Sequence, residues 1–263
     1  MTNSSHADVS LGLGLVALGR RWGFRPGEPP PPEAGRALLH HALARGIRLF
    51  DTAPAYGASE IVLGDFLREI GERRGELTIA TKMGEHWVGA GADTRADHSF
   101  PVLRDSIDES LRRLGRIDIM QIHKATQDNI LSDDVIRAIG YCRQKGISTF
   151  GVSASDAETL NLACASDFYT VLQFPYSRAN TKLAEVFELA RRHDMTLLVN
   201  RPFAMGELIP DGGAGKDVAM RDAFAFVLEQ DFTGHILTGT RNPAHLDEAI
   251  AAFAFSEPTP PSC

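Results

Sequence analysis

The segment Phe50-Asp51-Thr52-Ala53-Pro54-Ala55-Tyr56-Gly57 joins two regions with different periodicity. The apolar run at residues 47–50, just before Asp51, predicts a short buried strand. After the segment, apolar residues recur at helical spacing over residues 59–70. The proline and glycine of the segment interrupt regular structure, so Asp51 and Tyr56 are expected in a loop just beyond a strand end. Parallel α/β folds carry their chemistry in such loops.

The same strand–loop–helix unit recurs along the whole chain. Short apolar runs predict eight strands, at residues 11–18, 47–50, 77–81, 117–122, 147–152, 169–174, 196–199 and 235–238. Helical periodicity predicts eight helices, at residues 33–45, 59–70, 101–114, 133–145, 157–165, 182–192, 217–229 and 243–253. Repeated βα units favour a parallel sheet, and eight of them in roughly 250 residues match the closed (β/α)8 TIM barrel.

The alternative α/β architecture is an open, doubly wound sheet. That fold usually carries a G-x-G-x-x-G phosphate loop at its first strand–helix turn. The segment Gly12-Leu13-Gly14-Leu15-Val16-Ala17 lacks the third glycine, and a proline-rich loop follows it. We therefore predict a single TIM-barrel domain over residues 11–255, with flexible tails at residues 1–10 and 256–263.

Composition narrows the function classes. The chain has 263 residues, an apolar fraction of 43% and a net charge of -7, which suit a protein with a sizeable core and argue against a nucleic-acid or anionic-membrane partner. No apolar run reaches the roughly 18 residues of a membrane helix, and the polar start lacks the features of a signal peptide. Cys142, Cys164 and Cys263 show neither a disulfide framework nor metal-ligand spacing. We expect a cytoplasmic monomer or small homo-oligomer without a metal site.

Polar residues end three consecutive predicted strands. Asp51, Lys82 and His123 follow the second, third and fourth strands, and Tyr56 lies in the loop after the second. Neighbouring parallel strands lie about 5 Å apart, so these side chains are expected to meet at one mouth. An ammonium beside a phenol lowers the pKa of the phenol, and a carboxylate keeps the ammonium charged. A neutral histidine can orient a carbonyl oxygen. Each residue alone suits an ordinary surface or turn role, but the four together favour proton transfer.

The segment Phe50 to Gly57, with Ser59-Glu60 and Leu63-Gly64 after it, resembles the signature of the aldo-keto reductases. Ile79-Ala80-Thr81-Lys82 and Ile117 to His123 resemble the next two motifs of that family, in the same order. The resemblance implies a (β/α)8 barrel that reduces carbonyls with a nicotinamide cofactor, usually NADPH, bound without a Rossmann fold. It also implies that Tyr56 is the general acid, that Lys82 and Asp51 tune it, and that His123 orients the substrate carbonyl.

The resemblance extends through Gly151-Val152-Ser153 and reaches residues 238–246. It implies a cofactor site in which Ser153 and Gln173 hold the nicotinamide carboxamide and residues 239–241 meet the adenosine end. The cofactor-binding residues that it implies are Ser153, Gln173, Arg201, Gly239, Thr240, Arg241 and Glu248. Backbone amides at a helix start, as before the last predicted helix, favour phosphate.

Several positions depart from the family pattern. Ala154 stands where an asparagine that holds the carboxamide is common, and Asn200 stands where many members place a tyrosine that stacks on the nicotinamide. Near the expected 2′-phosphate, Gly239, His245 and Ala249 replace a common lysine, arginine and asparagine. These changes weaken the preference for NADPH over NADH, although Arg241 is available to compensate.

The sequence thus predicts an NAD(P)(H)-dependent oxidoreductase that acts on a small-molecule aldehyde, ketone or sugar-like alcohol. A non-redox isomerase or dehydratase that reuses the same four groups is an alternative that the sequence does not separate from it. A cofactor-binding regulatory subunit is a weaker alternative, because all four catalytic groups are present. The sequence does not identify the substrate.

Overall fold

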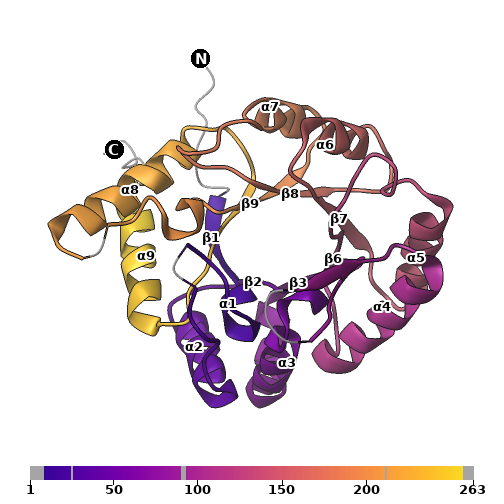
Figure 1. Cartoon of the computed structure of the whole chain (residues 1–263), viewed down its shortest axis with the longest axis horizontal. Helices are drawn as coiled ribbons and strands as arrows, with labels where there is room; N and C mark the ends of the chain where they lie inside the picture. The colour runs from indigo at the N-terminus through magenta and orange to yellow at the C-terminus, as the bar shows by residue number, and fades with distance from the viewer. Residues whose placement is uncertain (1–8, 25, 90–92, 211, 257–263) are drawn as a thin grey trace.

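The computed structural model describes residues 9–24, 26–89, 93–210 and 212–256. Eight parallel strands close into a barrel in the order β1-β10-β9-β8-β7-β6-β3-β2, and helices form a ring around it (Figure 1). The predicted TIM barrel is therefore confirmed. Its strands are β1 (Val9–Gly14), β2 (Leu49–Asp51), β3 (Thr78–Met83), β6 (Ile119–Ile122), β7 (Thr149–Ser153), β8 (Val171–Pro175), β9 (Thr196–Asn200) and β10 (Gly234–Thr238).

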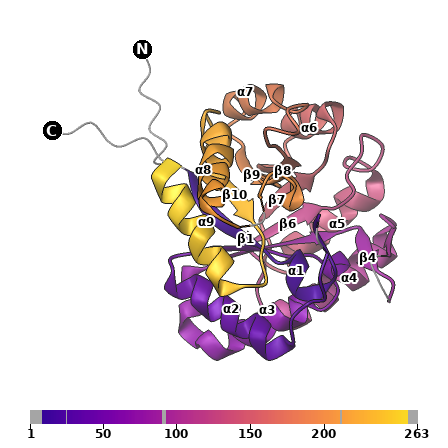
Figure 2. The same cartoon turned by 60° about the vertical axis from the view of Figure 1, so that its left-hand side comes forward.

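The outer helices follow the strands and cover the barrel from outside, as the turned view in Figure 2 also shows. They are α2 (Pro32–Ala44), α3 (Ser59–Ile70), α4 (Phe100–Leu114), α5 (Asp133–Gln144), α6 (Ala157–Cys164), α7 (Glu185–Arg192), α8 (Ala214–Leu228) and α9 (Pro243–Ser256). The one-turn helix α1 (Val16–Gly19) lies inside this ring and contacts α3 (Figure 1). Side-chain caps fix the start of two of them: Ser132 accepts from the backbone of Val135, and Asp156 accepts from that of Thr159.

A layer of apolar side chains fills the barrel interior. It consists of Leu49, Ala80, Ile119, Val171, Leu198 and Leu237. Successive side chains of a strand point to opposite faces, so the residue two positions further along the same strand also points inward. On five of these strands that residue is polar: Asp51, Lys82, Gln121, Gln173 and Asn200. The alternation of side chains along each strand therefore places an apolar layer inside the barrel. Polar side chains lie above it at the carboxyl ends of the strands, which form the mouth of the barrel.

Two regions differ from the sequence prediction. The first strand begins at Val9, because residues 9–13 pair with residues 234–238 of β10, and it ends at Gly14. The expected N-terminal tail is therefore shorter than ten residues, and the rest of both expected tails lies outside the described residues apart from Ser256, which ends α9. The end of the predicted strand at residues 11–18 is wrong, because residues 16–18 belong to the one-turn helix α1. Residues 82–100, for which the sequence predicts neither a strand nor a helix, contain an antiparallel hairpin of β4 (Glu85–Trp87) and β5 (Thr94–Ala96). Strands of three residues are too short to show a periodicity.

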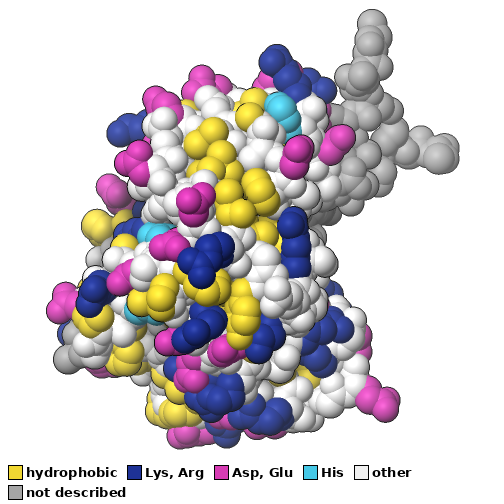
Figure 3. Space-filling model, turned by 90° about the vertical axis from the view of Figure 1, so that its right-hand side faces the viewer, with side chains coloured by type: hydrophobic (Ala, Val, Ile, Leu, Met, Phe, Trp, Pro, Cys, Tyr) yellow, Lys and Arg dark blue, Asp and Glu magenta, His cyan; other side chains and the backbone are white. Residues whose placement is uncertain are grey.

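The surface carries charges of both signs. On the face in Figure 3, acidic and basic side chains are interspersed, with apolar side chains between them. Within the described ranges, no helix is both long and apolar enough to cross a bilayer.

Candidate active site

A buried ion pair forms the base of the mouth. Lys82 Nζ donates to both carboxylate oxygens of Asp51 at 2.7 Å and to the carbonyl oxygen of Thr52 at 2.9 Å. Gln121 Nε2 donates to Asp51 Oδ1 at 3.1 Å. Burial opposes the charge of the Lys82 ammonium, but Asp51 and Tyr56 outweigh it and raise its pKa above the ordinary value. Lys82 is therefore a fixed positive charge.

Tyr56 lies above this ion pair, at the end of the short 3-10 helix η2 (Pro54–Tyr56). Lys82 Nζ is 4.8 Å from the centroid of the Tyr56 ring. Burial raises the pKa of Tyr56 above its ordinary value, Asp51 adds to this, and Lys82 opposes it. Lys82 thus acts on the pKa of Tyr56 in the expected direction, but desolvation of the phenolate outweighs this attraction, so the net pKa is raised. The phenol stays protonated at neutral pH, as a proton donor must be.

His123 follows β6 and faces the edge of the Tyr56 ring, with the ring centroids 5.8 Å apart. Its Nδ1 lies 2.9 Å from Glu85 Oε2 of the β4–β5 hairpin. The contact is a close approach and not a hydrogen bond, because no hydrogen bond among the described residues uses Nδ1. Burial and the charge of Lys82 lower the pKa of His123, while Glu85 opposes that change. The imidazole is therefore neutral at pH 7.

Two glycines let the Tyr56 loop pack closely on α1. A Cβ atom at Gly19 would lie 1.7 Å from the carbonyl oxygen of Tyr56, and one at Gly57 would lie 2.3 Å from the carbonyl oxygen of Gly19. Gly57 also has a φ of +58°, which disfavours residues with a side chain. Backbone contact between α1 and the loop thus fixes the height of the phenol above Lys82.

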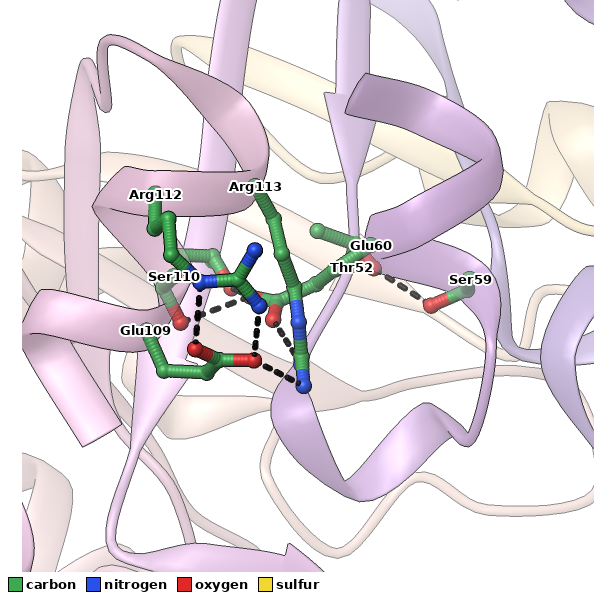
Figure 4. Close-up of polar contacts among 8 residues, drawn as sticks. Thr52, Ser59, Glu60, Glu109, Ser110, Arg112 and Arg113 are labelled. Carbon is green, nitrogen blue, oxygen red and sulfur yellow. Dashed lines mark hydrogen bonds and ion pairs between the residues drawn. The ribbon is translucent and has the colours of Figure 1, made fainter. Parts of the chain in front are cut away.

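A second polar network supports the site from behind (Figure 4). Glu60 of α3 is fully buried and accepts hydrogen bonds from Thr81 of β3 at 2.7 Å, Ser110 of α4 at 2.9 Å and Arg113 of α4 at 3.0 Å. Because Thr81 precedes Lys82, this network links the strand that carries the lysine to two outer helices.

The residues expected to hold the nicotinamide lie together. Ser153 ends β7 and is paired in register with Gln173 of β8. Gln173 Oε1 is buried, and no hydrogen bond among the described residues uses it. Asn200 Oδ1, on the next strand, is in the same situation. A carboxamide NH2 group would satisfy such an acceptor, so these residues fit the nicotinamide end of the cofactor.

The residues expected at the adenosine end occupy the start of α9. Thr240 Oγ1 accepts from the backbone N–H of Asn242 at 3.0 Å, and Glu248 pairs with Lys216 of α8 at 2.5 Å. The guanidinium of Arg241 packs against Gly27, where a Cβ atom would lie 1.9 Å from it. The loop between α1 and α2 thus reaches the start of α9.

Arg201, the remaining expected cofactor residue, follows β9 with a φ of +58°, and its guanidinium lies 5.6 Å from the Trp22 ring centroid. The guanidinium of Arg20 lies 5.1 Å from the centroid of the same Trp22 ring and 5.9 Å from the centroid of the Tyr56 ring. The sequence prediction did not include Trp22 or Arg20, because they fall in a loop whose path no periodicity indicates.

Two further residues were missed. Gln121 interrupts the apolar run Ile119–Ile122, and a polar side chain inside a buried strand was a usable signal. Glu85 had no such signal, because its position next to His123 depends on the hairpin.

A family model described as the aldo/keto reductase family matches residues 10–222. The chain belongs to this family. Among solved structures, a Pseudomonas aeruginosa protein assigned to the aldo-keto reductases is 29% identical with a TM-score of 0.78, covering 94% of this chain and 89% of that one. An aldo-keto reductase from Bacillus halodurans in its holo form is 22% identical with a TM-score of 0.77, covering 96% and 88%, and shares the fold.

Relatives known by sequence match a smaller share of this chain. The uncharacterized oxidoreductase YqkF of Bacillus subtilis is 28% identical over 214 residues, which are 78% of this chain and 64% of that protein. The aldo-keto reductase yakc of Schizosaccharomyces pombe, whose name carries NADP(+), is 26% identical over 208 residues, which are 76% of this chain and 59% of that protein. The match thus spans less than two thirds of the length of either relative.

Proposed function

We propose that this protein is a nicotinamide-dependent oxidoreductase that interconverts a small aldehyde or ketone and the corresponding alcohol. The observation that carries the proposal is the convergence of Asp51, Tyr56, Lys82 and His123 at one mouth, with the phenol over the buried ion pair. Family membership supports the same reaction class.

Each side chain has a separate task. The bound nicotinamide would supply the hydride, and Ser153, Gln173 and Asn200 would hold its carboxamide. Tyr56 gives its hydroxyl proton to the oxygen of the reduced carbonyl, and Lys82 stabilises the phenolate that remains. Asp51 keeps Lys82 charged and in place. His123 orients the substrate oxygen.

The test is a fluorescence titration with NADPH and with NADH, followed by a screen of aldehydes, ketones and sugar alcohols at saturating cofactor. Cofactor-dependent change in nicotinamide absorbance that disappears in Tyr56→Phe would support the proposal. Failure to bind either cofactor would contradict it and favour a non-redox proton transfer, such as an isomerisation or a dehydration.

A further inference from the structure

In the part of the chain that the structure describes, no hydrogen bond to Nδ1 holds the imidazole of His123 beside Tyr56. Glu85 Oε2 approaches that nitrogen to 2.9 Å without bonding to it. Burial disfavours the charge of Glu85, but the nearby His123 ring and a hydrogen bond from Thr94 Oγ1 outweigh burial and lower its pKa to about 2. The position of the imidazole therefore depends on how the backbone of His123 is fixed.

The backbone of His123 is anchored through both of its polar groups. Its N–H donates to the carbonyl oxygen of Met83 at 2.8 Å, which continues the pairing of β6 with β3. Its carbonyl oxygen accepts a hydrogen bond from His98 Nε2 at 2.8 Å. A carbonyl oxygen can only accept, so Nε2 of His98 carries a proton. The first anchor belongs to the barrel sheet, whereas the second comes from a side chain just after β5.

The second anchor lies where the chain turns sharply after β6. Lys124 has a φ of +51°, and such a left-handed conformation costs a residue other than glycine about 1–3 kcal/mol. Asn129 Nδ2 donates to the carbonyl oxygen of Lys124 at 3.0 Å and lies 3.5 Å from His98 Nδ1. His98 and Asn129 thus hold the carbonyl groups of two consecutive residues, His123 and Lys124, at this turn.

Gly84 determines where the ring of His98 lies. The N–H of Asp97 donates to the carbonyl oxygen of Gly84 at 2.9 Å, so the chain returns to Gly84 after the β4–β5 hairpin. A Cβ atom at Gly84 would lie 2.3 Å from His98 Nε2, so the ring packs directly on the glycine backbone. The hairpin thus brings a hydrogen-bond donor to the carbonyl group of His123.

We propose that His98 is a positioning residue, whose hydrogen bond to the His123 carbonyl oxygen keeps the His123 imidazole against the Tyr56 ring. The task of His123 in orienting the substrate oxygen rests on the proposed function, but its place beside Tyr56 does not. A displacement of about 1 Å at a reacting group can cost about a hundredfold in rate. Loss of the anchor should therefore lower kcat by up to about a hundredfold.

The test compares two variants of His98. His98→Phe keeps a ring but removes the donor, whereas the amide Nε2 of His98→Gln can donate to the same carbonyl oxygen. The first measurement is the nuclear Overhauser effect between the ring protons of Tyr56 and His123 in the protein without cofactor, assigned with Tyr56→Phe and His123→Gln. The two rings meet edge to face in the wild type, with their centroids 5.8 Å apart. We expect the effect to be lost in His98→Phe and to return in His98→Gln.

The matched control is His193→Phe, which replaces an exposed histidine at the end of α7 and should leave the effect unchanged. The second measurement is kcat on the best substrate of the screen, which should fall in His98→Phe and recover in His98→Gln. A merely structural role for His98 would lower the Tm and leave the contact between the rings of Tyr56 and His123 unchanged in the folded protein.

Several outcomes would overturn the proposal. They are an unchanged Overhauser effect in a folded His98→Phe, the same behaviour in His98→Phe and His98→Gln, and an unchanged kcat in His98→Phe. If neither variant folds, nitrogen-15 NMR of the wild type decides, because an unprotonated His98 Nε2 would exclude the hydrogen bond. The Overhauser effect and the nitrogen-15 signal do not depend on turnover, so a failed substrate screen would contradict the proposed function alone.

Discussion

The hydroxyl group of Tyr56 supplies the proton in the proposed reaction, whereas substrate binding alone would not require that proton. In Tyr56→Phe the ring keeps its contact with Lys82 while the transferable proton is lost. General acid catalysis contributes about 10²–10⁴-fold, so turnover should fall by that factor while cofactor affinity stays nearly constant. Steady-state kinetics and a cofactor titration measure the two quantities. Near wild-type turnover in this variant would mean that Tyr56 is only a rim aromatic.

Lys82 has a structural role as well as a chemical one. Its side chain is fully buried, and among the described residues Lys82→Met would leave the Asp51 carboxylate with Gln121 as its one side-chain donor. Breaking a buried ion pair typically lowers the free energy of unfolding by about 3–5 kcal/mol. The control Lys145→Met breaks the exposed pair with Asp108, for which a loss of about 0–1 kcal/mol is expected. Urea unfolding of both variants measures the difference, and equal losses would contradict the buried pairing.

Lys82→Met should also lower turnover. The loss of the ammonium removes the group that stabilises the Tyr56 phenolate after proton transfer. Because Tyr56 and Lys82 act as one unit, the double variant with Tyr56→Phe should lose far less than the product of the two single effects. Strictly multiplicative losses in a double-mutant cycle would show that the two residues act independently.

Glu85 gives the stability a defined pH dependence. Its pKa falls from an ordinary 4.5 to about 2 on folding, so the carboxylate stabilises the folded state above pH 4.5 and this contribution disappears as the pH falls toward 2. The shift corresponds to roughly 3 kcal/mol. Between pH 6 and pH 3 the wild type should therefore lose more stability than Glu85→Gln. Chemical unfolding at the two pH values measures the free energy of unfolding. Equal losses in the wild type and in Glu85→Gln would contradict a lowered pKa of Glu85 in the folded state.

At the scale of elements, the site depends on how closely α3 packs against α4. A Cβ atom at Gly64 of α3 would lie 2.1 Å from the carbonyl oxygen of Arg113, so Gly64→Ala must push the two helices apart. We expect a loss of about 1–3 kcal/mol, as for other overpacked positions. The matched control is Gly140→Ala in α5, where a Cβ atom meets nothing within 4 Å and stability should rise by about 1 kcal/mol. In thermal unfolding, the Tm should fall for Gly64→Ala and rise for Gly140→Ala. A higher Tm in both variants would contradict the close packing of α3 on α4.

The elements also show what the sequence can predict. Runs of buried strand residues and helical spacing located all eight barrel strands, because each strand is buried on both faces and each helix on one. Asp51, Lys82 and His123 were found because strand ends are visible in the sequence. The hairpin that carries Glu85 was missed, because three-residue strands have no usable periodicity and their position depends on the Gly84 turn, with its φ of +102°.

At the scale of the whole molecule, cofactor binding should appear as stabilisation. A ligand at 100 times its Kd raises the free energy of unfolding by about 2.7 kcal/mol if it binds only the folded chain. One lost charge-assisted contact weakens binding by roughly ten- to a hundredfold. Because Gly239, His245 and Ala249 stand in place of stronger phosphate partners, we expect only a modest preference for NADPH over NADH. Thermal shifts measured with NADPH and with NADH at matched concentrations compare the affinities for the two cofactors. A preference above about a thousandfold would mean that Arg241 or another basic residue contacts the 2′-phosphate.

The seam between β1 and β10 joins the first and last strands of the barrel, with Val9 opposite Gly234 and Leu13 opposite Thr238. A ribosome adds about 5–20 residues per second, so the partner of β1 emerges roughly 10–45 s after it. Until then β1 and β9 each expose an unpaired edge, and such edges promote association between chains. A nascent chain released before residue 234 would keep both edges, which makes translation arrest in this region more hazardous than loss of the last helix alone.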